Sequence, residues 1–212
     1  MITNEGPLAG AMFTAMLKPR PTASQDHLEK EHNMTATFNT DKTQAAPVAE
    51  RTTPLDYVLG VTRIALGFTF LWAFLDKTFG LGHETASADS WVNGGSPTSG
   101  FLGHATKGPF ADFYQGMAGH AWADWLFMLG LLGIGTALIL GVAMRLAAVA
   151  GALLLVMMFT AVLPPENNPV IDDHIIYALV LGVLALAHAG RTIGFGKFWE
   201  RQPIVERSPF LK

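Results

Sequence analysis

The sequence contains no cysteine. The chain therefore cannot form a disulfide bond, ligate an iron–sulfur cluster or use a thiol as a nucleophile. Any redox chemistry in which it takes part must use a bound cofactor, a partner protein or groups other than thiols.

Charge is also scarce. Only 15% of the 212 residues are charged, whereas about 25% are charged in ordinary soluble domains. The formal net charge of -3 comes without a basic cluster and gives no indication of nucleic-acid binding. The composition is instead that of a membrane protein, because half of the residues are hydrophobic and the mean hydropathy is +0.32.

The apolar residues are most concentrated at 125–163, where Arg145 is the only charge. Each flank of Arg145 approaches the ~20 apolar residues that cross a bilayer as a helix. Neither flank has the polar face that a surface helix of a soluble protein carries. The stretch therefore predicts a hairpin of two transmembrane helices, at residues 125–144 and 146–163, with the bend at Arg145.

Small residues recur along this hairpin. Gly133, Ala137 and Gly141 are spaced four apart in the first helix, and Ala147 and Gly151 continue the pattern in the second. Residues four apart share one face of a helix, so we expect a smooth ridge that another helix approaches closely.

Two further apolar segments flank the hairpin, at residues 55–75 and 170–189. We therefore predict an all-α, polytopic membrane protein with a four-transmembrane-helix bundle at residues 55–190. A long extracytoplasmic loop at 76–124 separates the first two helices. Its end, residues 110–125, has apolar residues at helical spacing and predicts either an amphipathic segment at the membrane surface or a small cap on the bundle.

The two ends of the chain are polar. Residues 1–54 are rich in Thr, Ala, Pro and charge and predict a disordered cytoplasmic tail. The sequence leaves open whether translation begins at Met1 or at Met34. Residues 191–212 predict a basic cytoplasmic tail.

The positions of Lys and Arg predict the orientation. Arg51, Arg145 and the basic tail fall on one side of the predicted bundle, and Lys77 and Lys107 fall on the other. Because basic residues favour the cytoplasmic side, we expect both termini in the cytoplasm. The expected location is a bacterial inner membrane, with the lipid bilayer as the main partner.

Two short motifs resemble a known family. The first predicted helix carries R-I-A-L-G at 63–67 followed by Lys77, and the hairpin carries Gly133, Gly141 and then R-L-A-A at 145–148. Together these motifs resemble the DoxX family of small four-helix membrane proteins, including its DoxD-like members. The likeness extends over about residues 55–190.

The resemblance implies a function. DoxD-like members are linked, as the large subunit, to a membrane thiosulfate:quinone oxidoreductase, and other members to redox-stress complexes. One departure is that relatives often carry an acid within the start of the second helix. Here that region is LFMLGLL, and the nearest acid is Asp124.

The predicted outer end of the bundle collects polar residues. The candidate catalytic residues are Asp76, Lys77, Glu166, Asp172, Asp173 and His174. Titratable groups near a quinone could transfer the protons that quinone reduction requires. Two alternatives stay open: oxygen ligands for a divalent cation, or helix caps with a local pair between Asp76 and Lys77. We expect no metal.

Arg63 and Trp72 are the candidate contacts for a bound quinone. The alternatives for Arg63 are a side chain that reaches the near interface, or one that binds helix C-terminal carbonyls or lipid phosphates. Trp72 is alternatively an interface anchor. His174 and His188 would lie at opposite ends of the last helix and cannot share one iron, so we expect no haem.

The leading expectation is a subunit of a quinone-linked redox system, with thiosulfate:quinone oxidoreduction as the activity that the resemblance implies. A separate partner subunit or a homo-oligomer is expected with it. The alternatives are a non-catalytic accessory or assembly subunit of a respiratory or redox-stress complex, and a small carrier or lipid-handling protein.

Overall fold

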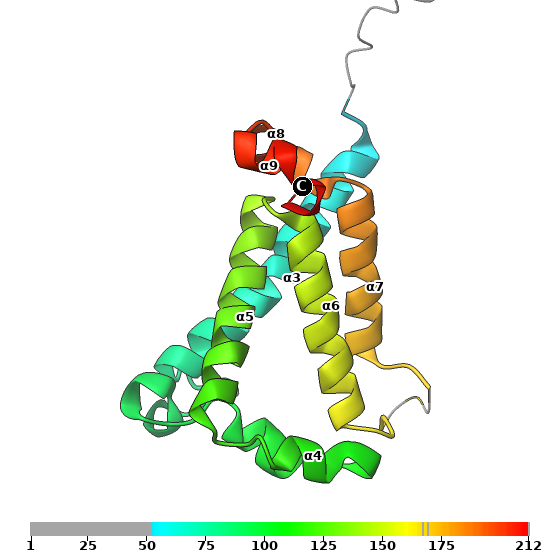
Figure 1. Cartoon of the computed structure of the whole chain (residues 1–212). Helices are drawn as coiled ribbons and strands as arrows, with labels where there is room; N and C mark the ends of the chain where they lie inside the picture. Colours follow the sequence, from blue (N-terminus) through cyan, green and yellow to red (C-terminus); the bar gives the residue numbers. More distant parts are fainter. Residues whose placement is uncertain (1–51, 167, 169, 212) are drawn as a thin grey trace, which may run out of the picture. The chain divides into compact units, whose positions relative to one another are not determined.

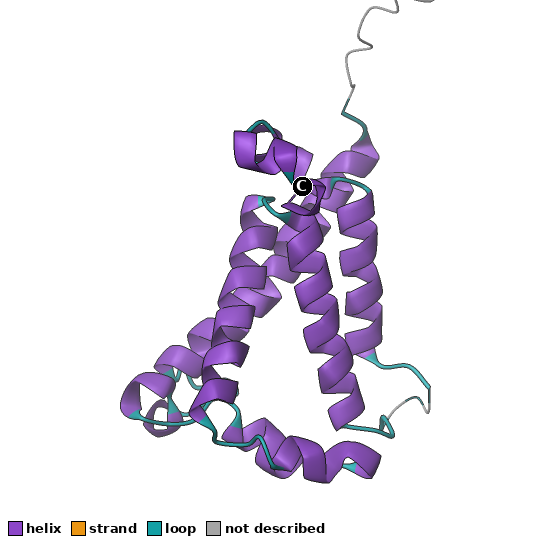
Figure 2. Cartoon of the chain, viewed as in Figure 1, coloured by secondary structure: helices purple, strands orange, loops and turns teal. Residues whose placement is uncertain are grey.

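The computed structural model describes residues 52–211, apart from 167 and 169. The chain divides into two units at Arg51 and Thr52, and the second unit is the one described below. Within the described residues every regular element is a helix, and no strand is present (Figure 2). The all-α prediction is therefore confirmed for this part of the chain. The predicted tail at 1–54 and the second start at Met34 lie outside it, except for residues 52–54.

Helix α3, Pro54–Phe79, is the first described helix. Thr53 and Asp56 form a capping box at its start, in which each side chain accepts a hydrogen bond from the backbone of the other residue. Pro54 occupies the first turn, where it has no hydrogen bond to lose. Gly80 ends the helix in the left-handed conformation, with φ of 64°. The helix thus extends four residues beyond the predicted end at residue 75.

Helices α5, Ala121–Leu140, and α6, Met144–Ala161, form the predicted hairpin. The bend lies at Gly141, which ends α5 with φ of 74°, and at Ala143, with φ of 48°. The prediction that Arg145 forms the bend is wrong, because Arg145 lies in the first turn of α6. Glycine adopts the left-handed conformation at little cost, and for this reason the chain reverses at Gly141.

Helix α7, Asp173–Leu186, is shorter than the segment predicted at 170–189. Asp172 caps its start by accepting a hydrogen bond from the backbone N–H of Ile175, at 3.3 Å. The helices α3, α5 and α6 are long and apolar enough to cross a membrane, whereas α7 has 14 residues and falls below that length.

Short helices follow α7. These are η5, Ala189–Arg191, α8, Gly196–Glu200, α9, Pro203–Arg207, and η6, Pro209–Leu211. Arg191 holds α8 through a two-pronged ion pair with Glu200, at 3.0 Å from Nε to Oε1 and 2.9 Å from Nη2 to Oε2. The predicted basic tail is therefore a folded segment over its described residues.

The long helices pack in two pairs, α3 with α5 and α6 with α7, and α5 contacts α6 less extensively (Figure 1). We call the end with the α5–α6 bend the bend end, and the opposite end the loop end. The buried core runs through all four helices. Its largest members are Leu66, Phe70, Met128, Leu131, Ile134, Leu138, Met144, Leu155, Leu181 and Leu184.

The predicted small-residue ridge does not form as expected. A Cβ atom on Gly133 would meet no atom within 4 Å, so this residue does not make a close helix contact. Instead, a Cβ on Gly135 would lie 2.7 Å from the backbone nitrogen of Leu71, and one on Gly67 would lie 2.8 Å from Leu138 Cβ. These two glycines bring α3 and α5 together. Gly151 does belong to a close contact, because a Cβ there would lie 2.7 Å from Leu181 Cδ1.

The loop between α3 and α5 lies at the loop end. It contains η1, Ser87–Asp89, η2, Trp91–Asn93, η3, Phe101–Ala105, η4, Gly108–Phe110, and α4, Ala111–Gln115. The backbone N–H of Lys107 donates to the carbonyl of Ala161 at 2.9 Å, which attaches this loop to the end of α6. α4 runs below α5 and α6 in Figure 1.

The outer faces of the long helices are apolar. Exposed side chains include Val58, Val61 and Phe68 on α3, Leu126 and Leu129 on α5, and Leu153 and Val156 on α6. A soluble protein rarely exposes so continuous an apolar surface. Together with the lengths of α3, α5 and α6, this exterior is that of a protein in contact with a lipid bilayer.

Candidate functional site: an apolar cavity between α5 and α6

A cavity of about 260 Å³ lies between α5, α6 and the loop. Its α5 wall runs from Trp122 to Ile134, and its α6 wall runs from Ala150 to Ala161. The loop contributes the floor, through residues Pro97, Thr98, Phe101, Leu102, Tyr114 and Met117. The cavity therefore lies in the half of the molecule towards the loop end.

Sparse packing between α5 and α6 leaves the space empty. Gly130 lines the cavity, and a Cβ atom there would meet nothing within 4 Å. Four lining residues are also exposed to the outside: Trp122, Leu126, Leu153 and Met157. Because these lie on both walls, the cavity opens sideways between the two helices. An apolar molecule could therefore enter it from the surrounding lipid.

The floor of the cavity carries its polar atoms. Tyr114 is 6% exposed, and its hydroxyl is hydrogen-bonded to Thr160 Oγ1 of α6 at 2.6 Å. Thr98 is 4% exposed and donates its hydroxyl to Asp124 Oδ1 at 2.6 Å. The two hydroxyl groups thus lie at one end of an otherwise apolar space.

Asp124 holds the floor in place. It is 6% exposed, and its Oδ1 also accepts hydrogen bonds from Thr98 N at 3.0 Å and Ser96 Oγ at 2.8 Å. Asp124 precedes the helix predicted at 125–144, whereas in the structure it lies in the first turn of α5. A carboxylate is stabilised there by the helix dipole and by its three donors.

The lining has no formal charge. Among the described residues that line the cavity, none is an Asp, Glu, Lys, Arg or His. Burying an ionised group in such a space without a partner would cost several kcal/mol or more. The cavity is therefore suited to a neutral, mostly apolar ligand.

The predicted catalytic residue Asp76 has a different role. It is buried and accepts backbone hydrogen bonds from His83, Glu84 and Thr85, at 3.3, 3.1 and 2.9 Å. Asp76 therefore fixes the start of the loop, as Asp124 fixes its middle. A carboxylate with three backbone donors is well satisfied without a ligand.

Lys77 and Glu166 each form a salt bridge. Lys77 Nζ lies 3.2 Å from Glu84 Oε2, and Lys107 Nζ lies 3.0 Å from Glu166 Oε1. Both acids are largely exposed, so each bridge contributes only about 0–1 kcal/mol to stability.

Asp172, Asp173 and His174 do come together at the start of α7. His174 Nδ1 lies 2.8 Å from Asp172 Oδ2 and 3.7 Å from Asp173 Oδ1. One ligand atom from each residue lies within 4.8 Å of the others, which is close enough for one metal ion. Asp172 also caps α7. The cluster is therefore explained by helix capping as well as by a metal site.

The predicted catalytic residues thus form three groups: Asp76 and the adjacent Lys77, then Glu166, and the α7 cluster. Lys77 pairs with Glu84 and not, as in the alternative of a local pair, with Asp76. Within the described part of the chain, no hydrogen bond or ion pair joins one group to another. None of the predicted catalytic residues lines the cavity.

Arg63 is fully buried, at 0% exposure. Its guanidinium donates to the carbonyls of Leu138 and Ile139 at the end of α5, and to that of Ile193 at 2.6 Å. Of the alternatives for this residue, the structure shows the helix C-terminal carbonyls and not a side chain reaching the interface. The negative end of the α5 dipole favours a cation at this position.

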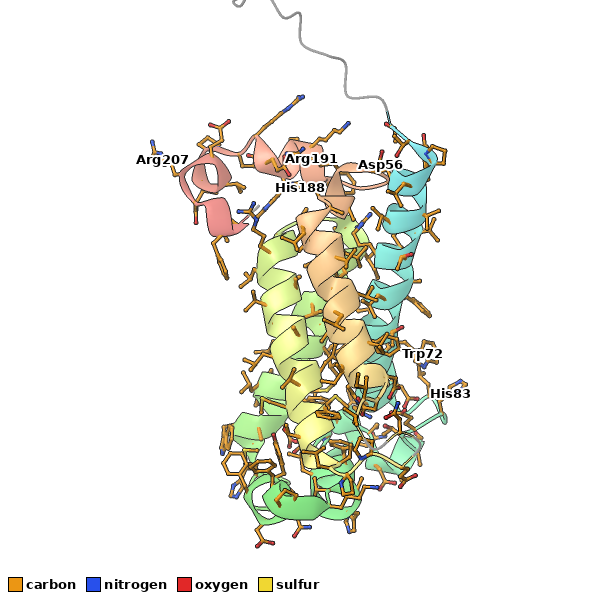
Figure 3. All side chains as sticks on the ribbon, turned by 90° about the vertical axis from the view of Figure 1, so that its right-hand side faces the viewer. Asp56, Trp72, His83, His188, Arg191 and Arg207 are labelled. Carbon is orange, nitrogen blue, oxygen red and sulfur yellow. The ribbon has the colours of Figure 1, made fainter. Side chains whose placement is uncertain are left out.

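Trp72, the other candidate quinone contact, lies away from the cavity. Its ring packs edge-on against His83, with centroids 5.2 Å apart (Figure 3). A second contact is with Phe68, whose ring is tilted by 34° at 5.9 Å. Neither Trp72 nor Arg63 lines the cavity. The sequence did not predict the cavity, since residues 110–125 indicated only an amphipathic segment or a small cap, and two residues of this stretch, Tyr114 and Trp122, line it.

Comparison of the chain with protein-family models, curated proteins and solved structures found no match.

Proposed function

We propose that this chain is the membrane subunit of a quinone-linked redox system of the DoxX and DoxD-like type, and that its quinone occupies the cavity between α5 and α6. The observation that carries the proposal is this uncharged cavity, open sideways between two apolar helices. Quinones with isoprenoid chains dissolve in the bilayer and reach a protein from the side.

The size of the cavity supports this ligand class. The α5 wall spans 12 helical steps from Trp122 to Ile134, or about 18 Å at ~1.5 Å per residue. A volume of about 260 Å³ lies slightly below the ~300 Å³ of the smallest usual ligand sites. It suits a ring with the first part of its chain, while the rest of the chain lies in lipid.

The proposed topology has four spans and cytoplasmic termini, in a bacterial inner membrane. α7 supplies the fourth span together with the residues on either side of it. Asp56, Arg191 and Arg207 lie at one end of the bundle, with His83 near the other (Figure 3). The exposed Lys197, Arg201 and Arg207 favour the cytoplasm for the bend end.

The electrons must come from outside this chain. It has no thiol, so a reductant such as thiosulfate, or a partner subunit that oxidises it, must deliver them. This requirement supports a subunit of a larger complex rather than a complete enzyme.

The test is quinone retention by the purified full chain in mild detergent. Extraction and mass spectrometry should detect bound quinone in the wild type, and Gly130→Leu, which fills the cavity, should remove it. Gly133→Leu is the matched control, because it lies on the same helix, has similar free space and does not line the cavity. Equal quinone content in all three proteins would refute the proposal.

A second candidate is an accessory subunit without catalysis. The observation that favours it is that Asp76 and Asp172 already serve the loop and the α7 cap. Reduction of a soluble quinone analogue by thiosulfate, measured by absorbance, separates the two candidates. Turnover that disappears in Asp172→Asn and His174→Ala supports catalysis at the α7 cluster. Inert protein that co-purifies with an oxidase supports the accessory role.

A further inference from the structure

The floor of the cavity is the only part of its lining with side-chain oxygens. Among the described lining residues, these belong to Thr98 and Tyr114. Both are almost completely buried, at 4% and 6% exposure, so neither is simply a surface hydroxyl. A polar end on an apolar site normally fixes the orientation of its ligand.

The hydroxyls at the floor are held from both sides. Tyr114 is joined to Thr160 of α6 at 2.6 Å, and Thr98 is joined to Asp124 of α5 at 2.6 Å. The loop thus bonds through one hydroxyl to α6 and through the other to α5, at residues that lie outside the lining itself. These bonds attach the floor to both helices that form the walls.

A hydroxyl can donate one hydrogen bond and accept others. Thr160 Oγ1 donates its single proton either to the carbonyl of Met157, at 3.0 Å, or to Tyr114. In the first arrangement Tyr114 donates to Thr160 and accepts from a ligand hydroxyl, and in the second Tyr114 donates to a ligand carbonyl. A carboxylate can only accept, and an ammonium can only donate. This pair consequently suits a neutral head group whose oxygen alternates between carbonyl and hydroxyl.

Aromatic side chains surround this end of the cavity. Phe101 and Tyr114 come from the loop, and Trp122 and Phe127 come from α5. Flat rings pack favourably against such side chains, with a gain of about 0.5–1.5 kcal/mol beyond simple burial. A fatty acid would instead bring a carboxylate near Asp124, with no cation in the lining to compensate it.

Resting on the proposed function, we infer that the quinone ring binds at the floor, with one ring oxygen against the Tyr114–Thr160 pair. The chain then leaves between α5 and α6 past Leu126 and Leu153, which are two of the four exposed lining residues. Asp124 acts as a positioning residue, because it holds Thr98 and touches no ligand itself.

The test measures binding of four probes to the full chain in detergent: a benzoquinone with a decyl chain, its hydroquinone, decanoic acid and decane. The wild type should bind the quinone and the hydroquinone within about threefold of each other. Decanoic acid should bind at least tenfold more weakly than the quinone. Equal affinity for decanoic acid and the quinone would overturn the inference.

The main variant is Tyr114→Phe, which removes only the hydroxyl. Loss of one hydrogen bond should weaken quinone and hydroquinone binding about fivefold and leave decane binding unchanged. Thr160→Val removes the partner from α6 and should act in the same direction, which covers the case in which Tyr114→Phe does not fold. Tyr177→Phe is the matched control, since Tyr177 lies on α7 outside the cavity lining.

The results separate this inference from the function on which it rests. If Gly130→Leu abolishes quinone binding while Tyr114→Phe and Thr160→Val bind like the wild type, the cavity is the site but the ring lies elsewhere. If Gly130→Leu also binds like the wild type, the cavity is not the site and the proposed function fails.

Discussion

The two faces of α5 differ in how closely a neighbouring helix approaches them. Towards α3, Gly135 and Gly67 leave less space than a methyl group needs. Towards α6, Gly130 adjoins a cavity of about 260 Å³. Glycine therefore has two opposite structural roles on α5. Gly135 permits close packing, and Gly130 leaves room for a ligand.

The largest expected effect is at the contact between α3 and α5, where Arg63 of α3 binds carbonyls at the end of α5. Arg63→Met should destabilise the protein by about 3 kcal/mol or more, because several carbonyls lose a charged donor in a buried place. Thermal unfolding in detergent measures this. Arg145→Met, in the first turn of α6, is the comparison. An equal loss of stability in both variants would contradict this role of Arg63 in joining α3 to α5.

A pair of alanine substitutions tests the two faces directly. Gly135→Ala should cost about 1–3 kcal/mol, because the new Cβ would lie 2.7 Å from the backbone of Leu71. Gly130→Ala should be neutral or stabilise the helix by up to about 1 kcal/mol, since alanine is the better helix former. Unfolding midpoints of the two variants give the comparison, and a reversed order would refute it.

Asp124→Ala should cost about 2 kcal/mol, because two buried donors of Thr98 and one half-buried donor of Ser96 lose their acceptor. The floor of the cavity should loosen with it, while the α3–α5 contact stays intact. Hydrogen exchange of the Thr98 backbone amide, which donates to Asp124, should rise in this variant. Unchanged exchange would show that Asp124 does not hold the floor.

The smallest effect is expected at the start of α7. Asp172→Ala removes a helix cap and should cost about 1 kcal/mol. Asp173→Ala is the control, because Asp173 is exposed and does not cap the helix. Thermal unfolding of both variants tests this, and equal midpoints would contradict the capping role.

The helical hairpin could be predicted because apolar length alone identifies it. The direction in which each helix faces could not. Gly133 was expected at a close contact, whereas Gly135 makes it. A helix that is apolar on every side has no polar face to indicate which side is turned towards the bundle. The spacing of small residues therefore does not distinguish Gly133 from Gly135.

The cavity could not be predicted from the sequence. Its size depends on how far α5 and α6 diverge along their lengths and on which side chains fill the space between them. The bond between Thr98 and Asp124 joins residues 26 apart across an irregular loop, which no local pattern predicts. The α7 cluster, by contrast, could be predicted because Asp172, Asp173 and His174 are consecutive in the sequence.

The sideways opening past Leu126 and Leu153 has a consequence for how affinity should be expressed. A molecule that arrives through this opening is dissolved in the lipid, so occupancy follows its mole fraction among the lipids and not its amount per volume of water. Diluting the vesicles with buffer should then leave the occupancy of the cavity unchanged. Adding lipid that contains no ligand should lower it.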